Sequence, residues 1–355
     1  MSVTTPAPHG NSSGPSDDQP LAVFFDTLTR RIIHEEHQTT RDEALRIAHV
    51  TEEDAMLLFH YAKQIREHFR GSTVSLCSIV NAKSGACSED CTFCAQSAHF
   101  KTGSPVYALM DPEEVVARAK VAKQDGAEAF GIVISGYGIK KQSELEAIGN
   151  MVRRVRDEVD IEVHGSFGIC SKEALDYLRE CGVTMLNHNL ETSERHYPEI
   201  CTTHTFEDRL WTIRNAKAAG MKTCSGGIFG MSEKLADRVD MAFSLRALDV
   251  DVIPLNFLHP IEGTPLDVVN PLPPLQCLLT VALYRFVLPR KEIKICGGRE
   301  KNLRDLQSLI FAAGADSMMI GNYLTTAGRE PETDYQMMRD LGLSWKAQNE
   351  TAPPA

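Results

Sequence analysis

Long apolar runs are missing from this sequence. No uninterrupted apolar stretch approaches the ~20 residues that a membrane-spanning helix needs. The first twenty residues, MSVTTPAPHGNSSGPSDDQP, also lack the apolar segment of a secretory signal peptide. We therefore expect a cytoplasmic protein with no membrane partner. Its ten cysteines would then lie in a reducing compartment, where thiols bind metals or react rather than form disulfides.

An excess of positive charge is missing as well. The net charge is -11, which argues against a nucleic acid or an anionic membrane surface as partner. The chain has 355 residues, of which 43% are hydrophobic, so it can bury a large core. Length alone suggests about two domains, but a single α/β barrel can reach ~250 residues.

Composition and patterning divide the chain into four parts. Residues 1–20 and 346–355 are rich in small and polar residues and in proline, so we predict disordered tails there. Residues 21–70 have helical periodicity, with Thr40 and Glu43 placed as a capping box. Residues 71–345 alternate between short β-branched runs and amphipathic helical segments.

The alternating region predicts an α/β fold built on a parallel sheet. Eight strands is the number that closes a (βα)8 barrel of the TIM type, here with an N-terminal helical extension; an open doubly wound sheet is the alternative. Several helical segments end at glycine, as expected for C-caps, and Pro112 is placed to open one helix. The predicted strands are 73–80, 129–136, 161–167, 183–191, 222–230, 251–258, 292–298 and 317–321.

Three cysteines lie within eight residues of the segment GACSEDCTFCAQS: Cys87, Cys91 and Cys94. A structural zinc site needs four ligands, and no partner C-x-x-C follows. Cys77 could supply a fourth, although it lies in a predicted core strand; a zinc-stabilised binding module is therefore the non-enzyme alternative. A 4Fe–4S cluster is usually held by four cysteines, so three would leave one iron open to a substrate or cofactor.

The spacing C-x-x-x-C-x-x-C, with Phe93 before the last cysteine, resembles the radical S-adenosylmethionine superfamily. The resemblance implies that the open iron chelates S-adenosylmethionine. One electron from the cluster would then cleave the cofactor to methionine and a 5′-deoxyadenosyl radical, which removes hydrogen from an unactivated C–H bond. Chemistry of this kind belongs to cofactors rather than to side chains.

The resemblance becomes closer across residues 40–345. The segments SIVNAKSGACSEDCTFCAQS, LNHNLETS, CTTHTFEDRLWTIRNAKAAGMKTCSGGIFG and NFLHPIEGTPL are similar to those of the biotin synthase family. That family implies a (βα)8 barrel that inserts sulfur into dethiobiotin. By motif, Asn189 and Glu191 would face S-adenosylmethionine and substrate, although well-known members have Asp at the second position. Asn256 would hydrogen-bond the ureido ring of dethiobiotin. A low-potential reductant such as flavodoxin or ferredoxin and a homodimer are also implied.

One departure from the family concerns its second cluster, a 2Fe–2S cluster that donates the sulfur. Its ligand positions are occupied here by Gly131, His164, Cys224 and Lys294, so that only Cys224 retains the expected residue. The auxiliary cluster is either built differently or absent. Cys201, where many relatives have an aliphatic residue, is a candidate replacement.

Two further features bear on the auxiliary cluster. His164 is a chemically reasonable iron ligand, and Cys296 shares an inward strand face with Lys294. Several segments also resemble the anaerobe-type branch of the family, whose auxiliary cluster is larger than 2Fe–2S. We therefore expect Cys224, with Cys201 and His164, to hold a 2Fe–2S or larger cluster.

Two other reactions remain open for such a barrel. One is a lipoyl synthase-like insertion of sulfur into an octanoyl chain, against which the retained Asn256 segment argues. The other is radical chemistry without sulfur transfer, as in related barrels that rearrange amino acids or assemble hydrogenase cofactors. Cys224 and Cys201 argue against it, because such enzymes need no donor cluster.

Overall fold

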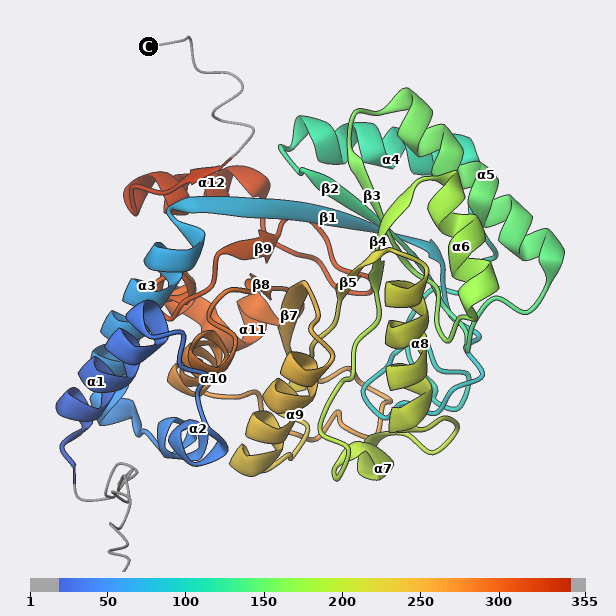
Figure 1. Cartoon of the computed structure of the whole chain (residues 1–355). Helices are drawn as coiled ribbons and strands as arrows, with labels where there is room; N and C mark the ends of the chain where they lie inside the picture. The colour runs from blue at the N-terminus through green and yellow to red at the C-terminus, as the bar shows by residue number, and fades with distance from the viewer. Residues whose placement is uncertain (1–18, 346–355) are drawn as a thin grey trace, which may run out of the picture.

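A closed parallel barrel forms the centre of the molecule (Figure 1). The computed structural model describes residues 19–345; the tails predicted at 1–20 and 346–355 lie outside this range apart from Gln19 and Pro20. Strand β1 pairs with both β2 and β9, which closes the sheet, and all pairings between the barrel strands are parallel. The predicted TIM-type fold is confirmed. The strands are β1 (Thr73–Lys83), β2 (Ala129–Ile134), β3 (Glu162–Ser166), β4 (Val183–Asn187), β5 (Lys222–Cys224), β6 (Gly227–Phe229), β7 (Val252–Phe257), β8 (Glu292–Ile295), β9 (Ser317–Met319) and β10 (Ser344–Trp345).

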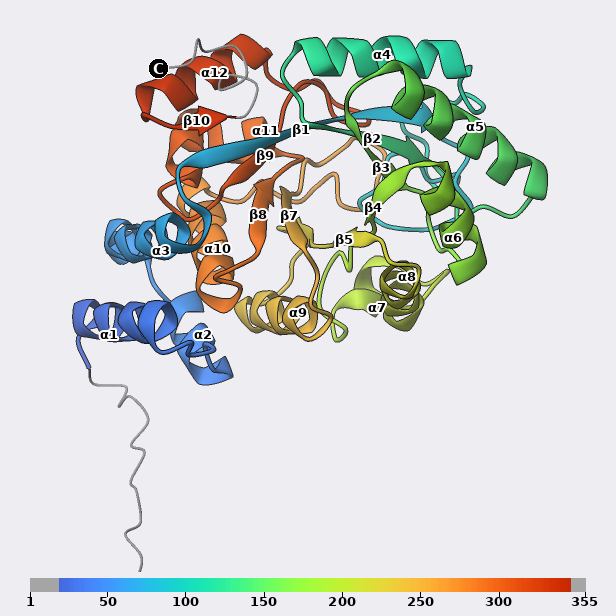
Figure 2. The ribbon, with the colours of Figure 1, turned by 45° about the horizontal axis from the view of Figure 1, so that its top comes forward.

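Helices surround the barrel and cover the outer face of its sheet (Figures 1 and 2). Pro112 is the first residue of α4, as predicted, and Asp111 caps this helix by accepting from the Glu113 amide. Every residue of α10 from Cys277 to Val287 is buried, so this helix is covered on its outer side as well. The helices are α4 (Pro112–Gln124), α5 (Gln142–Glu158), α6 (Lys172–Cys181), α7 (Tyr197–Ile200), α8 (Phe206–Ala218), α9 (Leu235–Ala247), α10 (Pro274–Val287), α11 (Arg299–Leu303) and α12 (Pro331–Asp340).

The N-terminal segment provides the cover for α10. It folds into α1 (Leu21–His34), α2 (Arg41–Ala48), a 3-10 turn (Glu52–Asp54) and α3 (Ala55–Arg70), which lie beside α9 and α10 in Figure 1. The rings of Phe25 and Phe286 lie 6.1 Å apart, and the Thr39 hydroxyl donates to the Phe286 carbonyl. The capping box of Thr40 and Glu43 is present as predicted.

The fifth predicted strand, 222–230, is not continuous. It divides into β5 and β6 at Ser225 and Gly226, where the backbone turns toward the loop after β4. The Gly226 amide donates to the Asn189 side chain, and a Cβ at Gly226 would overlap the Pro254 carbonyl. Only glycine permits this close approach. The fourth strand likewise ends at Asn187, so that Asn189 and Glu191 lie beyond the strand end.

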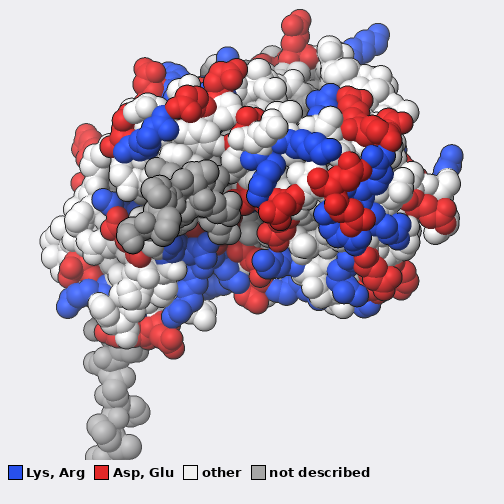
Figure 3. Space-filling view, turned by 90° about the horizontal axis from the view of Figure 1, so that it is seen from above, with Lys and Arg blue, Asp and Glu red and all other residues white. Residues whose placement is uncertain are grey.

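Charged side chains are mixed on the face seen in Figure 3, where acidic and basic groups alternate. This pattern differs from the continuous basic surface that binds a nucleic acid backbone. None of the helices between residues 19 and 345 combines the length and the apolar character that crossing a bilayer requires.

Candidate functional site

The cysteine triplet lies on the loop that follows β1, at the C-terminal end of the barrel. The loop folds back on itself, since the Cys87 amide donates to the Gln96 carbonyl and the Ala98 amide donates to the Cys87 carbonyl. The Cys94 amide in turn donates to the Cys91 carbonyl. These bonds hold all three thiols at the wall of one cavity of ≈ 250 Å³. The loop thus gathers the three predicted cluster ligands at the barrel mouth where TIM-type enzymes carry their active sites.

The pKa values of the triplet thiols lie above the ordinary value of a cysteine. Burial raises the pKa of Cys87, and it raises the pKa of Cys94 to about 11. Iron binds thiolates, so loading the site must release the thiol protons.

A second cavity of ≈ 290 Å³ adjoins the first at the same mouth. Cys94, Asn189 and Glu191 line both cavities, whereas Asn256 lines only the second. The predicted cluster, cofactor and substrate residues therefore follow one another across the mouth. This order is the one needed to place a cofactor between an iron cluster and a substrate.

Glu191 adopts a constrained conformation in this row. Its φ of 71° lies in the left-handed region, which few residues other than glycine adopt. Burial raises the pKa of Glu191, while the charge of Arg209 acts against that rise. Asn189 donates to the Glu191 carboxylate over 3.3 Å, so the two predicted cofactor residues are held together.

Arg209 was not predicted from the sequence. It lies on α8, and its guanidinium donates to the Asn189 carbonyl over 2.9 Å and to the Tyr197 hydroxyl over 2.5 Å. Glu191 is 3.5 Å away. No local pattern indicates this role, because an arginine on an amphipathic helix ordinarily faces solvent. Only the packing of α8 against the barrel mouth brings it to the site.

Asn256 has both ends of its amide engaged. The side-chain oxygen accepts from the Gly297 amide over 2.9 Å, and the nitrogen donates to the Gly227 carbonyl over 3.2 Å. An amide oxygen can accept two hydrogen bonds and an amide nitrogen can donate two, so one of each stays available to a ligand. The backbone contacts fix the orientation in which Asn256 offers them.

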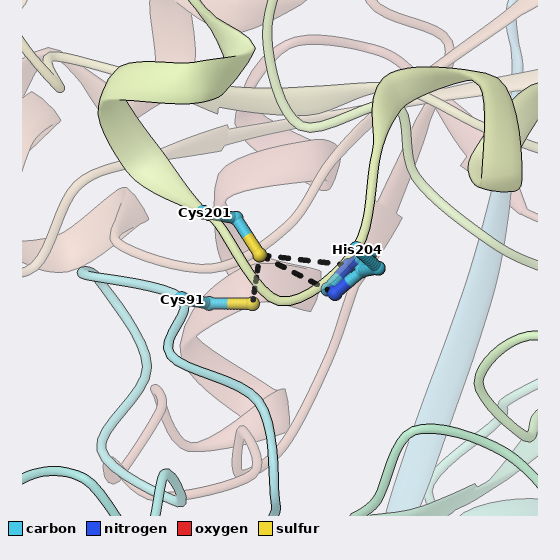
Figure 4. A group of neighbouring side chains, drawn as sticks. All are labelled: Cys91, Cys201 and His204. Atoms are coloured by element: carbon cyan, nitrogen blue, oxygen red, sulfur yellow. Dashed lines mark hydrogen bonds between the residues drawn. The ribbon is translucent and has the colours of Figure 1, made fainter.

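Cys201 lies beside Cys91 of the triplet (Figure 4). Its Sγ is 3.7 Å from Cys91 Sγ and 3.3 Å from His204 Nδ1. The three residues could hold a metal ion, since their ligand atoms lie within 4.8 Å of one another. The structure therefore does not bring Cys201 together with Cys224 and His164, contrary to the expectation of a shared site, because the chain after α7 returns to the triplet loop.

A second group of thiols occupies the barrel interior. Cys77 on β1, Cys224 on β5 and Cys296 directly after β8 are all buried, and each is within electrostatic range of the others and of Lys294. Burial raises the pKa of Cys224 to about 12, against the influence of the Lys294 charge. Burial alone would lower the pKa of Lys294. The neighbouring Cys77, Glu292 and Cys224 act in the opposite direction and raise that pKa above its ordinary value.

His164 adds an imidazole to this group. Its side chain is 6% exposed, and its Nε2 has no hydrogen-bond partner among the described residues; the Glu162 carboxylate, at 3.7 Å, is too far for a hydrogen bond. An unpartnered buried nitrogen that shares a cavity wall with Cys77 and Lys294 fits an iron–sulfur donor set. The sequence suggests Cys77 only as a zinc ligand. Its inward position on β1 is the feature that could have predicted its place in this group.

Known proteins resemble this chain over most of its length. Residues 82–245 match the Radical SAM superfamily, and residues 254–344 match the Biotin and Thiamin Synthesis associated domain. A biotin synthase of Geotalea daltonii is 55% identical over 324 residues, covering 91% of this chain and 98% of that protein. The chain belongs to the biotin synthase family. A family member from Geobacter sulfurreducens is 51% identical and covers 90% of this chain and 97% of its own.

Solved structures support the fold alone. Methylornithine synthase superposes with a TM-score of 0.79 at 20% identity, covering 91% of this chain and 98% of that chain. A maturase of the [FeFe]-hydrogenase, HydG, gives a TM-score of 0.78 at 15% identity, covering 92% and 76%. At such low identity the likeness extends to the barrel and not to its chemistry.

Proposed function

We propose that the protein is a radical S-adenosylmethionine sulfurtransferase that converts dethiobiotin to biotin. Membership of the biotin synthase family at 55% identity over nearly the whole chain carries this proposal. Two groups of thiols within one barrel support it, because a sulfur-inserting enzyme needs a radical generator and a separate sulfur donor. The lipoyl synthase-like and non-sulfurating alternatives have no comparable support.

The triplet would hold the first cluster. Cys87, Cys91 and Cys94 would bind three irons of a 4Fe–4S cluster and leave the fourth for S-adenosylmethionine. When bound, the cluster supplies the electron that cleaves the cofactor. Asn189 and Glu191 would orient the cofactor between the two cavities, supported by the contacts of Arg209 with the Asn189 carbonyl and the Glu191 carboxylate.

Dethiobiotin would occupy the second cavity. Asn256 offers one donor and one acceptor to the ureido ring, which presents the complementary pair. Apolar side chains of Ile79, Ile228 and Leu258 line the same cavity and suit the hydrocarbon part of the substrate. These side chains also exclude water from the reacting C–H bonds.

The interior thiols would hold the auxiliary cluster, 2Fe–2S or larger. We assign Cys224 and His164 to it, as the sequence predicts, and add Cys77 and Cys296. Lys294 would balance the negative charge of the sulfur ligands. We group Cys201 with the first cluster instead, because its contacts are with Cys91 and His204.

The remaining expectations concern partners and compartment. We expect a low-potential reductant such as flavodoxin or ferredoxin to supply the electron. A cytoplasmic location suits ten free cysteines, because that compartment keeps thiols reduced. We also expect the protein to act as a homodimer.

Anaerobic turnover tests the function. The purified protein, reconstituted with iron and sulfide, is supplied with S-adenosylmethionine, a reductant and dethiobiotin, and products are measured by mass spectrometry. We expect 5′-deoxyadenosine together with biotin. Biotin formation from dethiobiotin but no product from an octanoyl peptide would separate this activity from the lipoyl synthase-like one. Cleavage of the cofactor without sulfur insertion into either substrate would contradict the proposal.

A further inference from the structure

A third cavity opens at the opposite, N-terminal end of the barrel. It has a volume of ≈ 380 Å³ and is lined by the first residues of the barrel strands and by Arg70 at the end of α3. Residues at the strand starts, such as Glu162 and Lys222, form its outer part. The N-terminal end of a TIM-type barrel ordinarily serves stability, so an open polar cavity there requires another explanation.

This cavity reaches the interior thiol group at Cys77. Cys77, His164 and Lys294 line it, whereas the described residues of the two C-terminal cavities include none of these three. A route from solvent to Cys77, the first of the interior thiols, therefore begins at the end of the barrel opposite the triplet. The unpartnered Nε2 of His164 lies along this route.

The rim of the cavity carries charges of both signs. The Lys222 and Arg290 side chains are 63% and 60% exposed, while Glu162 and Asp251 supply carboxylates. Cations at an opening attract an anion such as hydrosulfide, and carboxylates attract ferrous iron. A mixed rim suits the passage of both, and it does not suit the tight binding of either.

We propose that this N-terminal cavity is the entry route by which ferrous iron and hydrosulfide reach the interior thiols. The inference rests on the proposed function, in which the interior cluster loses sulfur to each product and must be rebuilt. S-adenosylmethionine and dethiobiotin would occupy the C-terminal mouth during this time. Separate entrances at the two ends let the enzyme be resupplied without releasing its other ligands.

Blocking the rim tests the route. Ser75 lines the cavity two residues before Cys77 on the same side of β1, so Ser75→Trp should narrow it. Lys222→Trp is a second plug at an exposed rim position, which protects the test if Ser75→Trp fails to fold. The matched controls are Ser143→Trp and Lys120→Trp, on α5 and α4 outside this cavity.

The readout is the rate at which the clusters form. Cluster-free protein is given ferrous iron and sulfide anaerobically, and the two clusters are followed separately by Mössbauer and absorption spectroscopy. We expect the plugs to slow interior cluster formation about tenfold or more, because a side chain must move before each entry. The triplet cluster, at the other end, should form at the wild-type rate in every variant.

Adding S-adenosylmethionine and dethiobiotin to protein that holds only the triplet cluster should leave interior assembly unchanged. The proposed route would be overturned if a folded plug variant formed the interior cluster as fast as the controls do. It would also be overturned if S-adenosylmethionine and dethiobiotin strongly slowed formation of the interior cluster. A wild-type protein that takes up only the triplet cluster would instead contradict the interior site itself.

Discussion

The Sγ atoms of Cys91 and Cys201 lie 3.7 Å apart, although 110 positions separate the two residues in the chain. One is a ligand of the proposed radical-generating cluster, and the other follows α7. In the metal-free structure the Cys91 thiol donates to Cys201 Sγ; once Cys91 binds iron as a thiolate it can only accept, so a hydrogen bond between the two then requires Cys201 as the donor. Hydrogen bonds to ligand sulfur are one of the factors that set the potential of iron–sulfur clusters.

Cys201→Ala should therefore make the triplet cluster harder to reduce without removing it. Loss of one hydrogen bond to a ligand sulfur, worth ~1.4 kcal/mol, corresponds to about 60 mV for one electron. A redox titration followed by electron paramagnetic resonance measures the shift, and Cys201→Ser, which keeps a donor, should show less of it. Loss of the auxiliary cluster from Cys201→Ala would instead restore the first expectation that Cys201 binds that cluster.

Replacing Cys87, Cys91 or Cys94 by Ala should abolish reductive cleavage of S-adenosylmethionine. Each variant lacks one of three thiolates, and no other described residue of that loop offers a thiolate in its place. 5′-Deoxyadenosine, quantified by chromatography, is the measurement. Cys277→Ala, which removes a buried thiol of α10 that lines neither C-terminal cavity, is the control and should keep wild-type cleavage. Undiminished cleavage in the triplet variants would refute the cluster assignment.

Asn256→Leu should weaken dethiobiotin binding by about tenfold or more. The change leaves the Gly297 amide and the Gly227 carbonyl without their partner and removes both groups offered to the ureido ring; one unmatched buried group costs ~1–3 kcal/mol. Equilibrium binding to the reconstituted protein measures the effect, with S-adenosylmethionine affinity as the internal control. Equal loss of both affinities would indicate general damage to the mouth rather than a substrate contact.

Arg209→Met should impair cofactor binding. Without Arg209, the largest influence that opposes the burial of Glu191 is lost and its pKa rises further; removing one partner of a buried pair costs ~3–5 kcal/mol. Affinity for S-adenosylmethionine, measured by calorimetry, should fall about thirtyfold if half of that cost, ~2 kcal/mol, is felt at the cofactor. Arg214→Met, an exposed position on the same helix, should bind normally. Normal binding by both variants would remove Arg209 from the site.

Much of the fold follows from local sequence rules. The capping box at Thr40, the proline at the start of α4 and the alternation of strands and helices all predict the barrel correctly. The break between β5 and β6 could not be predicted, because it depends on the close approach of Gly226 to Pro254 on a neighbouring strand.

The site, like the fold, has residues that the sequence predicts and residues that it does not. The triplet is visible because its three thiols are adjacent in sequence, and Asn189, Glu191 and Asn256 come from family motifs. Cys77 and Arg209 join their groups only through barrel closure and helix packing, which no short segment encodes. The place of Cys201 beside Cys91 could not be predicted for the same reason: composition shows that a thiol is present, but not which end of the barrel it reaches.

The central claim is that one barrel holds two clusters, and Cys224→Ala tests it most directly. Wild-type and variant proteins are reconstituted anaerobically, and iron, sulfide and Mössbauer components are quantified before and after a single turnover. The account predicts two components in the wild type. It predicts that the variant retains the triplet component, still forms 5′-deoxyadenosine, lacks the second component and yields no biotin. A variant that keeps both its full iron content and its biotin formation would contradict the account.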